Sequence, residues 1–123
     1  MLVRYLCLLV GEPGQKGPQP GSAEFMQMLD EYRTATAEMD AKGVLVDSGP
    51  LQMPESAKTL RVRGGKPFVT DGPFAESKEV VGGYYILDCA DFDEVFRWMA
   101  TVPAAKYGAV DVRPLMTEFP NPA

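Results

Sequence analysis

Apolar residues run without interruption from Leu6 to Val10, and a second apolar run surrounds Tyr84 and Tyr85. Short runs of this kind, partly β-branched and aromatic and bounded by glycine or proline, are typical of buried strands. Other short stretches alternate between polar and apolar residues, which also indicates strands. Together the pattern predicts strands at residues 2–10, 44–51, 58–63, 66–70, 80–89 and 109–116. Pro114 favours an edge position or a strand end for the last of them.

Two further segments carry apolar residues at helical spacing. The first begins at Ser22, a favourable N-cap, and ends at Gly43, where glycine commonly follows a helix. The second begins at Asp91, and Glu94 three residues later resembles a capping box. The apolar stripes are formed by Phe25, Met28, Leu29, Tyr32, Ala35 and Met39 in the first segment and by Phe92, Val95, Phe96 and Met99 in the second. A single stripe predicts a helix that lies on one face of a sheet.

The predicted order of elements is β-α-β-β-β-β-α-β, in which two β-α-β halves flank a central hairpin turning at Gly64 and Gly65. Both helices must cover the same face of an antiparallel sheet to bury their stripes. We therefore expect an α+β fold of ferredoxin-like architecture (dimeric α/β-barrel type), with two helices on one face of an antiparallel sheet. The length predicts a single domain over residues 1–123.

The second face of this sheet is also predicted to be apolar. Tyr84 and Ile86 alternate with Tyr85 and Leu87, and the first strand carries leucines on both of its faces. The two helices can cover only one face. Because large apolar patches are rarely left in contact with water, we expect the other face to pack against a second copy in a homodimer.

Composition and charge exclude several classes of function. Twelve basic and seventeen acidic residues give a net charge of −5 and argue against nucleic acids and anionic membranes as partners. No apolar run reaches the roughly 18 residues of a membrane span. Cys7 and Cys89 lie in apolar strands and are expected to be buried thiols of a cytoplasmic protein. The chain has no histidine, which excludes the usual Ser-His-Asp and Cys-His catalysts, and we expect neither a metal site nor a cofactor.

One local motif narrows the choice of function. Residues 70–76 read Thr-Asp-Gly-Pro-Phe-Ala-Glu, followed by Lys-Glu at 78–79 and Gly-Gly-Tyr-Tyr at 82–85. In these residues the chain resembles the YCII-related family, in its Asp-Gly-Pro-Phe (DGPF) branch. The resemblance implies a small bacterial protein of ferredoxin-like fold that forms dimers with clefts between the sheets. Some relatives are lyase-like enzymes with a His-Asp pair, a mechanism that this histidine-free chain cannot share. Members of the branch are often associated with alternative sigma factors, which implies a regulatory setting.

The acidic residues of this motif allow two interpretations. Asp71 can accept backbone hydrogen bonds in an Asx-turn, or it can face a cleft at a strand end as a general base or ligand acceptor. Glu76 and Glu79 are spaced so that a helical turn would pair them for acid-base chemistry, although solvated carboxylates are the simpler alternative. Phe74 either fills a gap in the core or borders the cleft.

Cations and tyrosines of the strands complete the candidate site. Arg4, Arg61 and Arg113 either form structural ion pairs, with Asp71 or Glu76 as possible partners, or make a cationic wall for a small anionic ligand. Tyr84 and Tyr85 either belong to the core and an interface or donate hydrogen bonds into the same cleft.

These residues support two main hypotheses of function. The first is a lyase or isomerase that acts on a small anionic substrate, with Asp71 as the base and an arginine holding the anion. The alternative is a non-catalytic ligand-binding or regulatory accessory protein that uses the same pocket. A third possibility is a structural interaction module in which the Asp71 loop only shapes the dimer.

Overall fold

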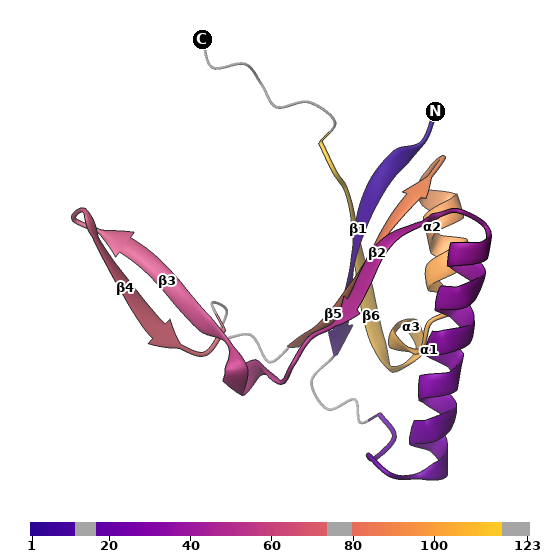
Figure 1. Ribbon diagram of the computed structural model, residues 1–123, viewed down its shortest axis with the longest axis horizontal. Coiled ribbons are helices and arrows are strands. Elements are labelled where there is room, and N and C mark those ends of the chain that lie inside the picture. Colours follow the sequence, from indigo (N-terminus) through magenta and orange to yellow (C-terminus); the bar gives the residue numbers. More distant parts are fainter. Residues whose placement is uncertain (12–16, 74–79, 117–123) are drawn as a thin grey trace.

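The computed structural model of the chain describes residues 1–11, 17–73 and 80–116 and consists of a four-stranded antiparallel sheet, a separate two-stranded hairpin and helices on one side (Figure 1). The sheet contains β1 (Val3–Gly11), β2 (Leu45–Pro50), β5 (Val80–Cys89) and β6 (Gly108–Pro114). The hairpin contains β3 (Lys58–Arg63) and β4 (Lys66–Asp71). The helices are α1 (Ala23–Ala41), α2 (Phe92–Met99) and α3 (Pro103–Tyr107), and a single 3-10 turn, η1 (Pro54–Ser56), precedes β3.

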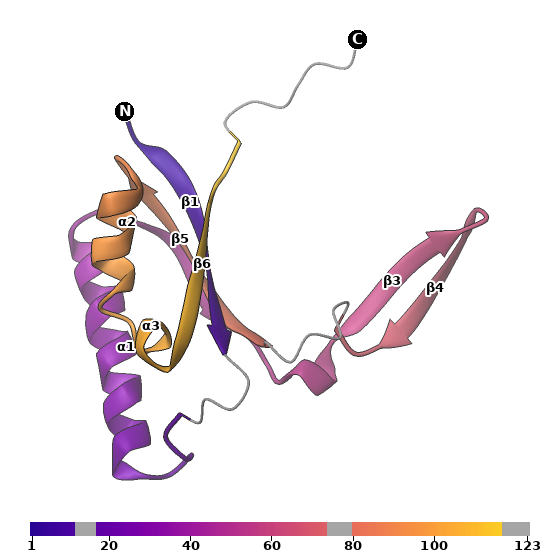
Figure 2. The ribbon, with the colours of Figure 1, turned by 180° about the vertical axis from the view of Figure 1, so that it is seen from behind.

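The strand order β2-β5-β1-β6 confirms the predicted ferredoxin-like architecture. The two central strands come from the two β-α-β halves, and Figure 2 shows that the helices lie together on one side of the sheet. Pro114 lies in β6 at the sheet edge, as its missing amide donor requires. The short helix α3 was not predicted. Pro103 occupies its first turn, where proline is favourable, but five residues are too few to show a helical period.

Capping residues set the ends of the helices as the sequence predicts. The Ser22 hydroxyl accepts a hydrogen bond from the amide of Phe25 at 3.1 Å, and Gly43 follows α1 with a φ of 75°. Asp91 accepts from the amide of Glu94 at 2.9 Å. The Glu94 carboxylate accepts from the amide of Ala90, one residue before the cap, so the reciprocal contact of a capping box is shifted by one position.

The hydrophobic core lies between the helices and one face of the sheet. Its buried members are Tyr5, Cys7, Ala35, Met39, Tyr85, Leu87, Cys89, Val95, Met99 and Val102. Alternation along β1 and β5 brings Tyr5, Cys7, Tyr85 and Leu87 to this face, which is the pattern of a strand covered on one side. Both cysteines are free thiols.

The other face of the sheet, here called the open face, carries half-buried Leu6, Leu8, Tyr84 and Ile86. The register pairs Leu6 with Ile86 and Leu8 with Tyr84, so these side chains form a continuous apolar strip across the two central strands. The prediction that both faces of the sheet are apolar is thus confirmed. None of the described helices covers the open face (Figures 1 and 2).

The hairpin of β3 and β4, here called the arm (residues 58–71), projects from the side of the sheet opposite the helices (Figure 1). Gly64 and Gly65 have φ values of 59° and 77°, which are the conformations of a type I′ turn. The turn and the pairing of Arg63 with Lys66 agree with the predicted hairpin.

Among the helices that the structure describes, none has the length and apolar character needed to cross a membrane.

Candidate functional site

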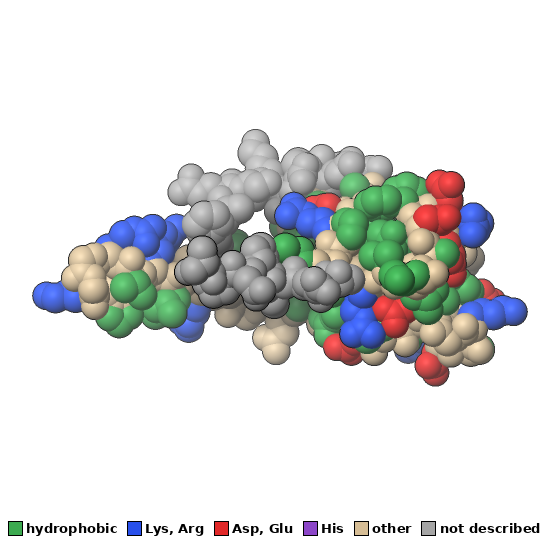
Figure 3. All heavy atoms as spheres, turned by 90° about the horizontal axis from the view of Figure 1, so that it is seen from above, with side chains coloured by type: hydrophobic (Ala, Val, Ile, Leu, Met, Phe, Trp, Pro, Cys, Tyr) green, Lys and Arg blue, Asp and Glu red, His purple; other side chains and the backbone are tan. Residues whose placement is uncertain are grey.

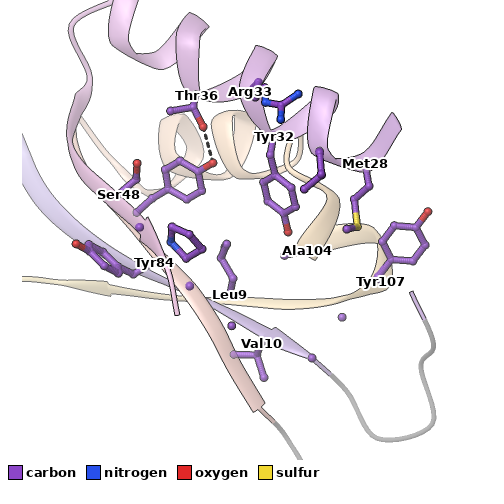
Figure 4. A pocket seen from close by; sticks show the side chains of 18 of the residues that line it. Leu9, Val10, Met28, Tyr32, Arg33, Thr36, Ser48, Tyr84, Ala104 and Tyr107 are labelled. Carbon is purple, nitrogen blue, oxygen red and sulfur yellow. Dashed lines mark hydrogen bonds between the residues drawn. The ribbon is translucent and has the colours of Figure 1, made fainter. Parts of the chain in front are cut away.

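A pocket of about 860 Å³ lies between α1 and the helix-covered face of the sheet (Figure 4). Helix α1 forms one wall, strands β1, β2 and β5 form the floor, and α3 closes one end. The side chains that define it are mostly apolar or hydroxylated: Leu9, Met28, Leu29, Tyr32, Thr36, Leu45, Ser48, Tyr85, Ala104 and Tyr107. We call this cavity the α1–sheet pocket.

The pocket exists because α1 packs closely on the sheet along only part of its length. Ala35 and Met39, toward the C-terminal end of α1, are buried, whereas Tyr32 one turn before Ala35 and Met28 two turns before it are half-buried. The floor below contains Gly82 and Gly83, which leave room because they carry no side chain. A β-carbon on Gly83 would lie 2.9 Å from the Gly49 carbonyl oxygen, so this position is restricted to glycine.

Two tyrosine hydroxyls reach the interior of the pocket. The Tyr85 hydroxyl and Thr36 Oγ1 share a hydrogen bond of 2.7 Å, drawn as the dashed line in Figure 4. The Tyr32 hydroxyl points toward Ala104 at the closed end (Figure 4). Burial raises the pKa of Tyr32, an effect strengthened by the neighbouring Tyr85 and partly offset by a hydrogen bond with the Ala104 backbone. Burial also raises the pKa of Tyr85. Both phenols are therefore neutral hydrogen-bonding groups near pH 7.

Charged groups of the pocket lie on the solvent-exposed side of α1. Arg33 lines the pocket, and its guanidinium forms an ion pair of 3.0 Å with Asp30 on the outside of the helix. Asp40, the second-last residue of α1, also lines the pocket and is exposed. The interior is thus lined by apolar groups and hydroxyls, with charges at the mouth.

The tyrosines and arginines predicted from the sequence are placed in two different environments. Tyr84 and Tyr85 both line the α1–sheet pocket, but the Tyr84 hydroxyl donates a 3.1 Å hydrogen bond to Asp47, whereas the Tyr85 hydroxyl is paired with Thr36. Arg4 donates to both carboxylate oxygens of Asp88, at 2.9 and 3.1 Å, and this pairing lowers the pKa of Asp88.

Arg113 pairs with Asp111 at 3.3 Å. Arg4 on β1 and Arg113 on β6 therefore each have a carboxylate partner on the sheet. The expectation that Asp71 pairs with Arg4 or Arg113 is wrong, and its counterpart for Glu76 lies outside the described residues. The register of the sheet brings Asp88 opposite Arg4, and Asp111 lies two residues from Arg113 on the same strand.

Asp71 lies at the base of the arm, where its side chain is 85% exposed and accepts a 2.6 Å hydrogen bond from Lys58 Nζ. The following Gly72 has a φ of 99° and donates its amide to the Ala57 carbonyl at 2.8 Å, and Thr59 donates to the Gly72 carbonyl at 2.8 Å. This part of the motif is therefore a closed turn with local partners. Arg61 lies on the same arm.

Phe74 and Glu76 lie outside the described residues. The remaining candidates form three groups: Tyr84 and Tyr85 line the pocket, Arg4 and Arg113 lie on the sheet outside it, and Arg61 and Asp71 lie on the arm.

Sequence reasoning missed most of the pocket. Tyr32 and Met28 were predicted only as members of the apolar stripe of the first helix, and Thr36 and Ser48 were not predicted at all. Two signals were present. Consecutive glycines within a strand mark a close backbone approach or an open space, and Thr36 is a hydroxyl in register with the apolar stripe.

Comparisons with known proteins identify the family of the chain. The sequence profile of the YCII-related domain matches residues 3–119. An uncharacterised protein of Rhizobium meliloti (strain 1021) is 44% identical over 68 residues, which are 54% of this chain and 55% of the relative, so the match spans about half of the relative's length.

A solved structure, the 5-chloro-2-hydroxyhydroquinone dehydrochlorinase of Burkholderia phenoliruptrix AC1100 in complex with 2,5-dihydroxybenzoquinone, is 19% identical with a TM-score of 0.47. The alignment covers 92% of this chain and 93% of that one.

The profile match extends over nearly the whole chain and includes every element of the four-stranded sheet. Assignment to the DGPF branch stays a prediction from the sequence motif. The chain belongs to the YCII-related domain family.

Proposed function

We propose that the protein binds a small, largely apolar ring compound with one or two hydrogen-bonding groups in the α1–sheet pocket. The observation that carries the proposal is the combination of apolar walls with the Tyr85–Thr36 pair and the Tyr32 hydroxyl inside one cavity. A volume of about 860 Å³ lies within the range of roughly 300–1,000 Å³ typical of small-molecule sites. A few polar groups among apolar walls orient a ligand without a large desolvation cost.

The charges around the pocket favour a ligand whose inner portion is neutral. Arg4 and Arg113, which the sequence suggested as anion-binding groups, are engaged by carboxylates on the sheet and do not line the pocket. Arg33 does line it, but an anionic group would have to compete with Asp30 for its guanidinium. The neutral hydroxyls of Tyr32 and Tyr85 are suited to a carbonyl, a phenol or an alcohol.

Binding of 2-naphthol, a fluorescent ring compound with one hydroxyl, tests the proposal directly. Ala104→Phe places a ring at the closed end of the pocket beside Tyr32, and we expect it to weaken binding at least about tenfold, which corresponds to roughly 1.4 kcal/mol. Ala105→Phe is the matched control, because it adds the same ring to the next position of α3, which is exposed and does not line the pocket. Equal affinities of wild type and Ala104→Phe would refute binding in this pocket.

A lyase or isomerase is the second candidate function. The supporting observation is that the two neutral tyrosine hydroxyls can donate hydrogen bonds to an oxygen on which negative charge develops, as enolate-forming reactions require. Asp71 is the base predicted from the sequence; its side chain is 85% exposed, pairs with Lys58 and does not line the α1–sheet pocket of the same chain.

Turnover separates the two candidates. Loss of turnover in both Tyr32→Phe and Asp71→Asn supports the enzyme. Binding of a substrate-like ring compound without turnover supports a ligand-binding or regulatory accessory protein.

We further propose that the open face of the sheet is covered by a second copy of the chain. Leu6, Leu8, Tyr84 and Ile86 form its apolar strip, and the ion pairs Arg4–Asp88 and Arg113–Asp111 flank it. A twofold dimer brings this strip against itself. Leu8→Lys places a charge in the strip, and the protein should then sediment as a monomer; an unchanged dimer would contradict this arrangement.

A further inference from the structure

The arm has two chemically different faces. Residues directly opposite each other in an antiparallel pair point to the same side, and the register pairs Leu60 with Val69 and Val62 with Pro67. These four residues form one apolar face, and the Lys58–Asp71 ion pair lies on the same side at the base of the arm. The opposite face carries Thr59, Arg61, Arg63, Lys66, Phe68 and Thr70. The arm is therefore an amphipathic ribbon with an apolar side and a largely basic side.

The apolar face is left uncovered within one copy of the chain. Leu60 is 63% exposed, Val62 is 55% exposed and Val69 is 58% exposed. An isolated two-stranded hairpin is at best marginally stable in water and needs a further layer of structure against its apolar face. The exposed leucine and valines thus indicate that another surface packs on the arm.

The position of the arm points to a second copy of the chain as this surface. The arm extends from the side of the sheet on which the open face lies, whereas the helices occupy the other side (Figures 1 and 2). A copy that packs on the open face would therefore lie alongside the arm. Each copy has one arm and one open face, so a twofold axis makes the contact reciprocal.

Charge complementarity favours the same occupant. The arm contains Lys58, Arg61, Arg63 and Lys66 against the single acidic residue Asp71, a net charge of +3. The whole chain has a net charge of −5, so the remainder carries −8. Figure 3 shows basic side chains around the hydrophobic ones on the arm, while acidic side chains gather on the body of the molecule. A basic arm is attracted to the acidic body of another copy.

We infer that the arm is a clasp that packs its face of Leu60, Val62, Pro67 and Val69 against a second copy of the chain in a closed dimer. The inference rests on the dimer proposed above and adds a second, separate area of contact to the open face. The base of the arm includes Asp71 of the Asp-Gly-Pro-Phe motif, which forms the first cross-strand pair of the arm with Lys58.

Sedimentation equilibrium across a micromolar dilution series of the full chain tests the clasp. Leu60→Ser combined with Val69→Ser should weaken dimerisation at least about tenfold, because central apolar contacts carry most of the energy of an interface. Phe68→Ser is the matched control: it removes an exposed apolar side chain from the next position of β4, but on the opposite face. We expect this control to dimerise like the wild type.

The outcomes distinguish the clasp from the dimer as a whole. A wild type that stays monomeric overturns both proposals. A wild-type dimer with an unchanged dissociation constant in Leu60→Ser/Val69→Ser overturns the clasp alone, and open-ended larger oligomers overturn the closed arrangement.

Amide hydrogen exchange of the wild type serves as a second measurement if the double variant fails to fold. Amides of β3 and β4 should exchange more slowly at concentrations where the protein is dimeric than where it is monomeric. Exchange in the arm that does not depend on concentration would refute the clasp.

Discussion

Replacing Tyr85 with phenylalanine removes the hydroxyl that joins the sheet to α1 across the α1–sheet pocket. Tyr85 is only 4% exposed, and its hydroxyl lies 2.7 Å from Thr36 Oγ1. A hydrogen bond of this kind contributes roughly 0.5–1.5 kcal/mol net. Thr36 is half-buried and lines the cavity, so water can replace the lost hydroxyl and keep the desolvation penalty small. We therefore expect Tyr85→Phe to lower the free energy of unfolding by about 1 kcal/mol.

A double-mutant cycle with Thr36→Val isolates this bond from other effects of the substitutions. If the two hydroxyls serve mainly each other, the double variant should lose about as much stability as either single variant, which gives a coupling energy of about 1 kcal/mol. Urea unfolding followed through the fluorescence of Trp98, the single tryptophan, provides the free energies. A coupling energy below about 0.3–0.5 kcal/mol, within which independent sites add, would refute the bond as a link between α1 and the sheet.

Three further predictions concern the core, the sheet and the pocket floor. Burial raises the pKa of Cys7 to about 12 and that of Cys89 to about 11. Iodoacetamide at pH 8 should therefore label neither thiol in the folded protein but both after unfolding. Fast labelling of the native state would contradict this burial. The pKa of Asp88 is lowered by Arg4, so this pair stabilises the fold above the ordinary aspartate pKa near 4 and loses its contribution as the pH falls below it. The difference in melting temperature between wild type and Arg4→Met should accordingly be seen at pH 7 and shrink toward pH 2, and a constant difference would be inconsistent with the ion pair. Gly83→Ala puts a methyl group 2.9 Å from the Gly49 carbonyl oxygen of β2 and should lower the free energy of unfolding, measured in urea, by about 1–3 kcal/mol. An unchanged free energy of unfolding would show that β2 and β5 can move apart at this position.

Most of the fold could be predicted from the sequence because each element carries a local signal. The helix period from Phe25 to Met39 lies between a serine cap and a glycine, and the hairpin has consecutive glycines at its turn. One apolar stripe on each helix determines which face of the sheet the helices cover. The short helix α3 has no such signal beyond Pro103.

The candidate site could be predicted only in part, because it depends on contacts between distant elements. The partner of Arg4 is set by the register of β1 against β5, and no local pattern indicates that Asp88 lies opposite it. The pocket depends on how α1 diverges from the sheet above Gly82 and Gly83, which is a property of packing rather than of sequence period. A tyrosine in a strand, such as Tyr85, is predictable as a candidate because its hydroxyl can reach a cleft. The helical spacing of Tyr32 predicts only a core residue, because the period carries no information about a cavity beside it.

The central claim, that the α1–sheet pocket binds a small ring compound, is tested most directly by mapping amide chemical shifts during a titration with 2-naphthol. The predicted result is a set of shifted resonances confined to α1 around Tyr32 and Thr36, to Gly82 and Gly83, and to α3 around Ala104. Shifts confined to the open face or the arm, or no shifts at saturating 2-naphthol, would contradict the claim.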